Sequence, residues 1–390
     1  MSDDRMSDPK TAACQNSATS DLALAKRINV GVVGCGFISD IYLQRMSRTF
    51  PVLRVEACAD KDPERARAAA ETAGARAVGV DELLEDDSID IVVNLTTPQS
   101  HASISIAALG AGRHVYSEKP LAVTREEAEA ILARASENER RVGCAPDTFF
   151  GAGIQTSRRI IDEGYLGQPL GASAHLLVPG QEFWHPEPDF YYQTGGGPLL
   201  DMAPYYLTAL VYLLGPVRSV TAKAKTSYTE REIHRGPRKG KKIKVEVPTF
   251  VSGALEFESG LIAAFLASYD VWATEQPHIE IYGTEGTLLV PDPDRFEGPV
   301  RISRRRKGWK QMPLRGEYAS NHRGIGVADM AHALLSGRPH RASAEMAYHV
   351  LDTAVSLAES ADKGAHVTVE SRCQRPAPLP EGLPYGILDE

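Results

Sequence analysis

The stretch Ile28-Asn-Val-Gly-Val-Val-Gly34-Cys-Gly36-Phe-Ile-Ser39 decides the fold. A run of apolar residues leads into two glycines, and an amphipathic stretch to about Arg48 follows, which is the pattern of strand, tight turn and helix. A pyrophosphate needs a backbone without side chains to approach it and helix N-terminal amides to bind it. Gly34 would supply the turn and Gly36 the close approach, while Ser39 takes the place of the third glycine of the fingerprint. We therefore predict a dinucleotide site at this turn.

The pattern of strand and helix repeats up to residue 146. Further strands are expected over 52–59, 89–95, 114–116 and 141–145, and helices over 63–73, 100–111 and 124–138. Strands that alternate with helices at this spacing indicate a doubly wound parallel sheet. We predict that residues 28–146 form a dinucleotide-binding Rossmann domain of α/β class.

After Pro146 the rhythm changes to longer segments of strand character separated by turn signals, with helices expected over about 151–163, 201–214, 326–335 and 344–363. This pattern predicts a second domain over 147–372, built on a large, mostly antiparallel sheet that carries a few helices. Residues 1–27 are polar and small and are interpreted as a flexible tail. The Pro-rich end, 373–390, is expected to be an extended arm.

Composition limits the classes of partner. The 390 residues carry 43 basic and 51 acidic side chains, a formal charge of −8, which gives no general attraction to nucleic acid or anionic membrane. Two basic runs, 231–244 and 301–310, are interpreted as solvated loops between strands. The five cysteines are scattered without a Cys-x-x-Cys pair, which fits a reducing cytoplasm. We predict a cytoplasmic protein without a metal, nucleic-acid or membrane partner.

Asp60 ends the second predicted strand, where an acidic residue binds the adenosine ribose. Its charge would repel a 2′-phosphate, which favours NAD, whereas Lys61 and Arg65 keep NADP as the alternative. His101, at a predicted helix start, could equally be a structural histidine. The residues expected to contact the cofactor are Gly34, Gly36, Phe37, Ile38, Asp60, Thr97, Pro98, His101, Glu118 and Lys119.

Trp184-His185-Pro186 through Tyr206 is the segment richest in chemistry-bearing residues. A glycine triplet opens a predicted helix on which Asp201 and Tyr205 are four residues apart, so both lie on one face. A carboxylate and a phenol on one face can form a proton-handling pair. The alternative is a capping aspartate with a packed tyrosine.

The ordered set of motifs resembles the glucose–fructose oxidoreductase / inositol dehydrogenase / MocA (Gfo/Idh/MocA) family over residues 28–372. The motifs that carry the resemblance are Gly34-x-Gly36, Thr97-Pro98-x-x-His101, Glu118-Lys119-Pro120, Gly195-Gly-Gly-x-Leu-x-Asp201-x-x-x-Tyr205, Glu280-Ile-Tyr-Gly-Thr-Glu-Gly and Gly337-Arg-Pro-His-Arg-Ala-Ser. The resemblance implies a Rossmann domain followed by a domain with a large open sheet. It also implies oxidation or reduction of a secondary alcohol in a sugar or cyclitol.

Carried over residue by residue, Lys119 matches the family's catalytic lysine and Asp201 its catalytic aspartate. Many members have histidine at the position of Tyr205, whereas tyrosine there resembles the glucose–fructose oxidoreductase and dimeric dihydrodiol dehydrogenase branches. Tyr205 is then the candidate acid/base, helped by the ammonium of Lys119, which favours a phenolate. Lys119 acting directly is the alternative.

The substrate is expected to be a sugar, glycoside or cyclitol. Trp184 and His185 are expected to line its pocket, and Asp147, which should lie near the nicotinamide, is also expected to contact the substrate. Two other functions stay open: a redox-neutral glycoside-processing enzyme that keeps its NAD, and a non-catalytic NAD- or sugar-binding regulator. Because an open sheet leaves one face to cover, we expect a homodimer or homotetramer.

Overall fold

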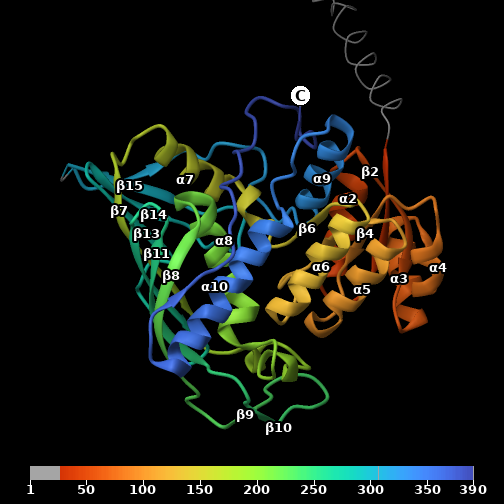
Figure 1. Ribbon diagram of the computed structural model, residues 1–390, viewed down its shortest axis with the longest axis horizontal. Coiled ribbons are helices and arrows are strands. Elements are labelled where there is room, and N and C mark those ends of the chain that lie inside the picture. The colour runs from red at the N-terminus through yellow and green to blue at the C-terminus, as the bar shows by residue number, and fades with distance from the viewer. Residues whose placement is uncertain (1–26, 306, 390) are drawn as a thin grey trace, which may run out of the picture.

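The computed structural model describes residues 27–305 and 307–389. The predicted tail, residues 1–27, lies outside this part of the chain except for Arg27. The described chain forms two sheets that meet along a layer of helices (Figure 1). The predicted fold class is confirmed.

The first sheet has six parallel strands in the order β3-β2-β1-β4-β5-β6, the doubly wound arrangement of a Rossmann domain. Its strands are β1 (Ile28–Val33), β2 (Leu53–Ala59), β3 (Arg76–Val78), β4 (Ile91–Asn94), β5 (His114–Ser117) and β6 (Val142–Cys144). The helices are α2 (Ser39–Arg48), α3 (Pro63–Ala73), α4 (Val80–Glu85), α5 (Pro98–Gly110) and α6 (Arg125–Glu137). Thr124 caps α6 by accepting a bond from the Glu127 amide, as its capping-box pattern predicts.

The second sheet has nine strands in the order β16-β15-β14-β13-β7-β12-β11-β8-β17. Each neighbouring pair is antiparallel except β12 and β7. The strands are β7 (Pro169–Leu177), β8 (Val217–Lys225), β11 (Phe250–Phe257), β12 (Ile262–Ser268), β13 (Ile279–Gly283), β14 (Gly286–Val290), β15 (Val300–Arg304), β16 (Trp309–Met312) and β17 (Val367–Thr368). The helices are α7 (Ala152–Asp162), α8 (Ala203–Leu214), α9 (Ile325–Ser336) and α10 (Ala344–Lys363).

The basic runs, expected as loops, contain strands. The first includes a separate hairpin of β9 (Glu230–Glu232) and β10 (Lys242–Lys244), and the second includes β15 and β16. In the first run, exposed polar and charged side chains alternate with the buried side chains of Ile233 and Ile243, which is the period of two of a strand. The many lysine and arginine residues make this alternation hard to recognise in the sequence.

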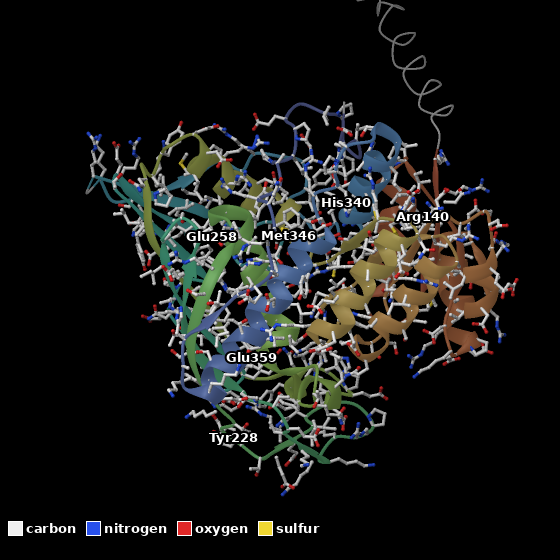
Figure 2. All side chains as sticks on the ribbon, viewed as in Figure 1. Arg140, Tyr228, Glu258, His340, Met346 and Glu359 are labelled. Carbon is white, nitrogen blue, oxygen red and sulfur yellow. The ribbon has the colours of Figure 1, made fainter. Side chains whose placement is uncertain are left out.

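Helices α8 and α10 lie between the two sheets, as Figure 1 shows. Every residue of α8 from Ala203 to Leu213 is buried, because the helix is covered on one side by the sheet and on the other by α10 and the Rossmann domain. Helix α10 is tied to α6 by Arg125, which donates to Asp352 at 2.6 Å and also pairs with Glu359, a residue labelled in Figure 2. This packing holds the end of β5 against the start of α8.

Candidate active site

Lys119 lies immediately after β5, at the carboxyl edge of the Rossmann sheet, where ligands bind in open α/β folds. Its Nζ donates to Asp201 Oδ1 and to the Asp201 carbonyl, both at 2.6 Å. The same ammonium lies 5.2 Å from the centre of the Tyr205 ring. The three residues predicted as catalytic from separate motifs thus come together at the junction of the two domains.

Asp201 lies on a π-helical turn, η4 (Pro198–Met202), and not on the α-helix expected from residue 201. Helix α8 begins only at Ala203. The wider turn places Asp201 and Tyr205 around the Lys119 ammonium, although they do not hydrogen-bond each other in the described structure. Such π turns occur often at functional sites.

The charges of this cluster are strongly coupled. Burial alone would lower the pKa of the Lys119 ammonium, but Asp201, Tyr205 and Glu118 outweigh it and hold that pKa well above its usual range. Burial raises the pKa of the Tyr205 phenol, an effect that Lys119 opposes. In the free protein the cluster therefore holds a charged lysine beside a protonated tyrosine.

Two residues that sequence reasoning missed complete the surroundings of Asp201. Tyr269, just after β12, donates its hydroxyl to Asp201 Oδ2 at 2.5 Å, and the Gln181 amide donates to the same oxygen at 3.4 Å. Gln181 also accepts the indole N–H of Trp184 at 2.5 Å. The Asp201 carboxylate is thus held from both sides.

Arg323 and Asp294 also went unrecognised. Arg323 Nη2 lies 3.5 Å from the Tyr205 hydroxyl and 2.6 Å from Asp294 Oδ1. The guanidinium is 12% exposed and lies 5.8 Å from the centre of the Tyr205 ring. Arg323 precedes α9 and Asp294 follows β14, so no motif or spacing connects either residue with Tyr205.

The glycine turn has the shape that a pyrophosphate requires. Gly34 has φ +97°, and a Cβ on it would lie 2.6 Å from the Leu95 carbonyl carbon, so the turn needs glycine here. A Cβ on Gly36 would meet nothing within 4 Å, which leaves space above the start of α2. Phe37 and Ile38 follow, and the Phe37 side chain is 81% exposed. The amides at the start of α2 thus border open space.

Asp60 ends β2 as predicted, and its carboxylate supports the turn. Its Oδ2 accepts from the Cys35 amide at 2.7 Å and its Oδ1 from the Asp62 amide at 2.9 Å. Asp60 remains partly exposed, and a carboxylate has acceptor capacity for further hydroxyl groups. Negative charge therefore lies at the edge of the predicted ribose site.

His101 has the structural contacts that its alternative interpretation predicts. Its ring nitrogens lie 2.6 Å from the Pro120 carbonyl oxygen and 3.0 Å from that of Thr96, and the side chain is buried. Thr97 and Pro98 begin α5 beside it. Glu118 is also buried and accepts from the Tyr42 hydroxyl at 2.8 Å. These contacts fix the loops around Lys119.

Asp147 has different surroundings from those expected. It is buried, and its Oδ2 accepts from the amides of Gly324 and Gly326 at 2.8 and 3.1 Å. Burial raises the pKa of this carboxyl to about 6. Its side chain thus holds the start of α9, next to Arg323, and a direct substrate contact remains only the prediction made from the sequence.

Trp184 and His185 lie beside the cluster of Lys119, Asp201 and Tyr205, on the segment between β7 and η4. The Trp184 side chain is 46% exposed, and its ring contacts His185 edge-on at 5.1 Å. Tyr191 packs near both rings, at 6.2 Å from Trp184 and 5.4 Å from His185. An aromatic wall therefore borders the site.

The Rossmann domain has a glycine turn, and a lysine–aspartate–tyrosine cluster lies at the carboxyl edge of its sheet. This combination is typical of the class of nucleotide-dependent oxidoreductases. Residues 28–145 match an oxidoreductase family with an NAD-binding Rossmann fold, and residues 154–289 match the GFO/IDH/MocA C-terminal domain. The chain belongs to the Gfo/Idh/MocA family of NAD(P)-binding sugar oxidoreductases.

Individual relatives show the extent of the similarity. The chain is 33% identical to a dTDP-3,4-didehydro-2,6-dideoxy-alpha-D-glucose 3-reductase of Actinomadura kijaniata, over 76% of this chain and 90% of that protein. It is 29% identical to a 1,5-anhydro-D-fructose reductase of Ensifer adhaerens, over 62% and 69%. A solved levoglucosan dehydrogenase in complex with NADH has the same fold, with a TM-score of 0.76 at 24% identity over 89% of this chain and 100% of that one.

Within residues 27–305 and 307–389, none of the helices has the length and apolar character that a membrane span requires. No described group of three His, Cys, Asp or Glu residues is arranged to hold a metal ion.

Proposed function

We propose that this protein transfers a hydride between a nicotinamide and a secondary alcohol or ketone of a sugar, glycoside or cyclitol. The observation that carries the proposal is the contact of Lys119 with both Asp201 and the Tyr205 ring, beside the glycine turn. A regulator that only binds ligands has no need of such a proton-handling cluster. The sugar reductases and dehydrogenases among the relatives support the substrate class.

The residues present fit a dinucleotide. The Gly34 turn and the open space above Gly36 suit a pyrophosphate at the start of α2, and Asp60 suits the adenosine ribose. The remaining residues proposed to hold the cofactor are Phe37, Ile38, Thr97, Pro98, His101, Glu118 and Lys119, with His101 and Glu118 acting through the loops that they fix. The bound nicotinamide supplies hydride acceptance or donation at the substrate carbon.

In alcohol oxidation, the substrate hydroxyl must lose a proton as the carbon–hydrogen bond breaks. We assign that proton to Tyr205, in the position where many relatives have histidine. An unperturbed phenol has a pKa of about 10, so it needs nearby positive charge to act as a base. The Lys119 ammonium supplies that charge, and Asp201 holds the ammonium in place through its 2.6 Å contact.

The direct test is turnover of a panel of sugars, cyclitols and glycosides with NAD and NADP, followed at the NADH absorbance band. We expect a net change in absorbance with at least one polyol. Product formation without any net change would instead identify the redox-neutral glycoside-processing reaction. No turnover of any polyol, with NAD binding intact, would contradict the proposal and favour the regulator.

We predict that NAD binds more tightly than NADP, because Asp60 places negative charge where a 2′-phosphate would lie. Calorimetric titration of each cofactor into the free protein measures the two dissociation constants. An Asp60→Ser variant should narrow the difference between them. Tighter binding of NADP by the unaltered protein would contradict this assignment.

We also predict a homodimer or homotetramer that covers the free face of the nine-stranded sheet. Helices α8 and α10 cover the other face (Figure 1), while Ile262 and Leu170 are 60% and 58% exposed. Light scattering at micromolar concentration should give at least twice the 42.3 kDa of one chain. An Ile262→Asp variant should weaken the association, and a monomeric unaltered protein would contradict the prediction.

A further inference from the structure

We infer that the site accepts a glycoside with a second, flat ring beyond the reacting sugar, and that Trp184 and Phe37 form the subsite for this ring. The inference rests on the proposed function and names the substrate class more closely. The second ring is either an aryl aglycone or another sugar, since both present an apolar face.

The indole N–H of Trp184 is held by a hydrogen bond, while part of the ring surface is exposed to solvent. Its N–H donates to Gln181 Oε1 at 2.5 Å, and Gln181 in turn donates to Asp201. The ring is nevertheless 46% exposed. A large aromatic ring that is held in place but left open to solvent is the usual form of a ligand platform.

The second step places this platform one ring away from the reaction. A single glutamine separates Trp184 from Asp201, and Tyr191 packs 6.2 Å from Trp184. Burial raises the pKa of the Tyr191 phenol most, Asp201 and Tyr205 raise it further, and Lys119 lowers it. Tyr191 therefore lies close to these three residues. A sugar bound at Lys119 would therefore have its neighbouring ring near Trp184.

The third step is the contact across the domain junction. Phe37, on the glycine turn, lies 6.4 Å from Trp184 and is 81% exposed. Two exposed aromatic side chains from different domains thus meet at the mouth of the site. The nearby cations Arg231 and Arg238 are already paired with Glu182 and Asp189. These features favour a neutral ring over a charged leaving group.

The experiment compares three substrates built on whichever sugar is turned over: its methyl glycoside, its phenyl glycoside and a disaccharide. We expect the phenyl glycoside or the disaccharide to have about tenfold higher kcat/KM than the methyl glycoside. Trp184→Ala should abolish that advantage, and Trp184→Phe should keep part of it. Trp309→Ala is the matched control, because that tryptophan is 43% exposed on the distant strand β16.

Calorimetric measurement of NAD affinity distinguishes a subsite for the second ring from the alternative that Trp184 packs over the bound cofactor. Unchanged NAD affinity in Trp184→Ala, together with the lost preference, supports the inference. Weaker NAD binding with an unchanged preference would overturn it, as would equal kcat/KM for all three substrates, or a preference for a dTDP-sugar over neutral glycosides. If no sugar, glycoside or cyclitol reacts, the proposed function has failed and not the subsite alone.

A second inference rests on a different observation. The geometry assigns Arg323 and Asp294 as positioning residues: Arg323 favours loss of the Tyr205 hydroxyl proton, and Asp294 opposes it. Arg323 lies between the Tyr205 hydroxyl, at 3.5 Å, and the Asp294 carboxylate, at 2.6 Å. The carbonyl of Asp294 also accepts from Arg323, at 3.3 Å. This inference rests on Tyr205 as the acid/base.

The loop that carries Arg323 is fixed from three directions. Asp147 accepts from the amides of Gly324 and Gly326, and Arg45 of α2 donates to the Asn321 carbonyl at 2.7 Å. Tyr385, in the C-terminal arm, bonds His322 at 2.6 Å. The guanidinium therefore has a fixed position next to Tyr205.

Six charged or titratable groups surround the Tyr205 phenol: Lys119, Glu118, Asp294, Arg323, Tyr191 and, through Lys119, Asp201. Lys119 and Arg323 lower the pKa of the phenol, while Asp294 and Glu118 raise it. Removing Arg323 or Asp294 should therefore move this pKa in opposite directions.

The test is the pH dependence of alcohol oxidation, whose rate rises as the phenol becomes a base. We expect Arg323→Gln to move the acidic limb to higher pH, Asp294→Asn to move it to lower pH, and Arg323→Lys to stay near the unaltered protein. Arg304→Gln is the control, because that arginine pairs with Glu285 on the sheet. Shifts in the same direction, or no shift in either variant, would overturn the inference, since a purely structural role predicts no opposite signs.

Discussion

Lys119→Met should lower the rate of hydride transfer by about 10²–10⁴-fold, the usual contribution of a general acid–base group. The substitution removes the ammonium bonded to Asp201, which is also the positive charge that most lowers the pKa of the Tyr205 phenol. Single-turnover formation of NADH with a confirmed substrate measures the loss. NAD affinity should change much less than the rate, because we propose that the glycine turn and Asp60 provide most of the cofactor contacts.

A control is needed because the Lys119–Asp201 pair is buried, with side chains 14% and 11% exposed. Removing one partner of such a pair leaves an uncompensated charge and costs about 3–5 kcal/mol of stability. The double variant Lys119→Met/Asp201→Asn removes both charges and should regain part of that stability. If the double variant melts like the unaltered protein but stays inactive, the lost activity reflects the missing charged pair and not unfolding.

The Rossmann half could be predicted from the sequence because each of its signals is local. The Gly34 turn, the strand end at Asp60 and the Thr124 cap each occupy a few consecutive residues, and all three lie where expected. For the nine-stranded sheet, the sequence predicts a large, mostly antiparallel sheet but not the order of its strands. Its order depends on pairings such as β7 with β12, about ninety residues apart, which no local pattern specifies.

The same distinction applies to the site. Lys119, Asp201 and Tyr205 belong to recognisable motifs, and the structure places them together. Arg323 and Asp294 belong to none, and only the folded chain brings the loop before α9 and the loop after β14 to Tyr205. The place of Asp147 at the domain crossing predicts a substrate contact, which stays a prediction, and gives no sign that its carboxylate accepts from the backbone amides of Gly324 and Gly326.

Tyr205→Phe should also slow hydride transfer by about 10²–10⁴-fold, because it removes the hydroxyl and keeps the ring that packs against Lys119. The side chain is 7% exposed, so the phenylalanine should pack normally and the melting temperature should change little. Tyr206→Phe is a matched control on the next residue of α8, since its hydroxyl bonds His278 and not the catalytic cluster. That control should keep near-normal rates.

The double variant Tyr205→Phe/Lys119→Met separates the two possible acid/bases. If tyrosine and lysine act as one unit, the double variant should lose less than the product of the two single losses, because removing either member already disables the unit. The same single-turnover measurement gives all three rates. Near-normal rates in Tyr205→Phe, with Lys119→Met inactive, would identify the lysine as the acid/base. Tyr205 would then be part of the pocket wall, and the opposite-sign effects assigned to Arg323 and Asp294 would fail with it.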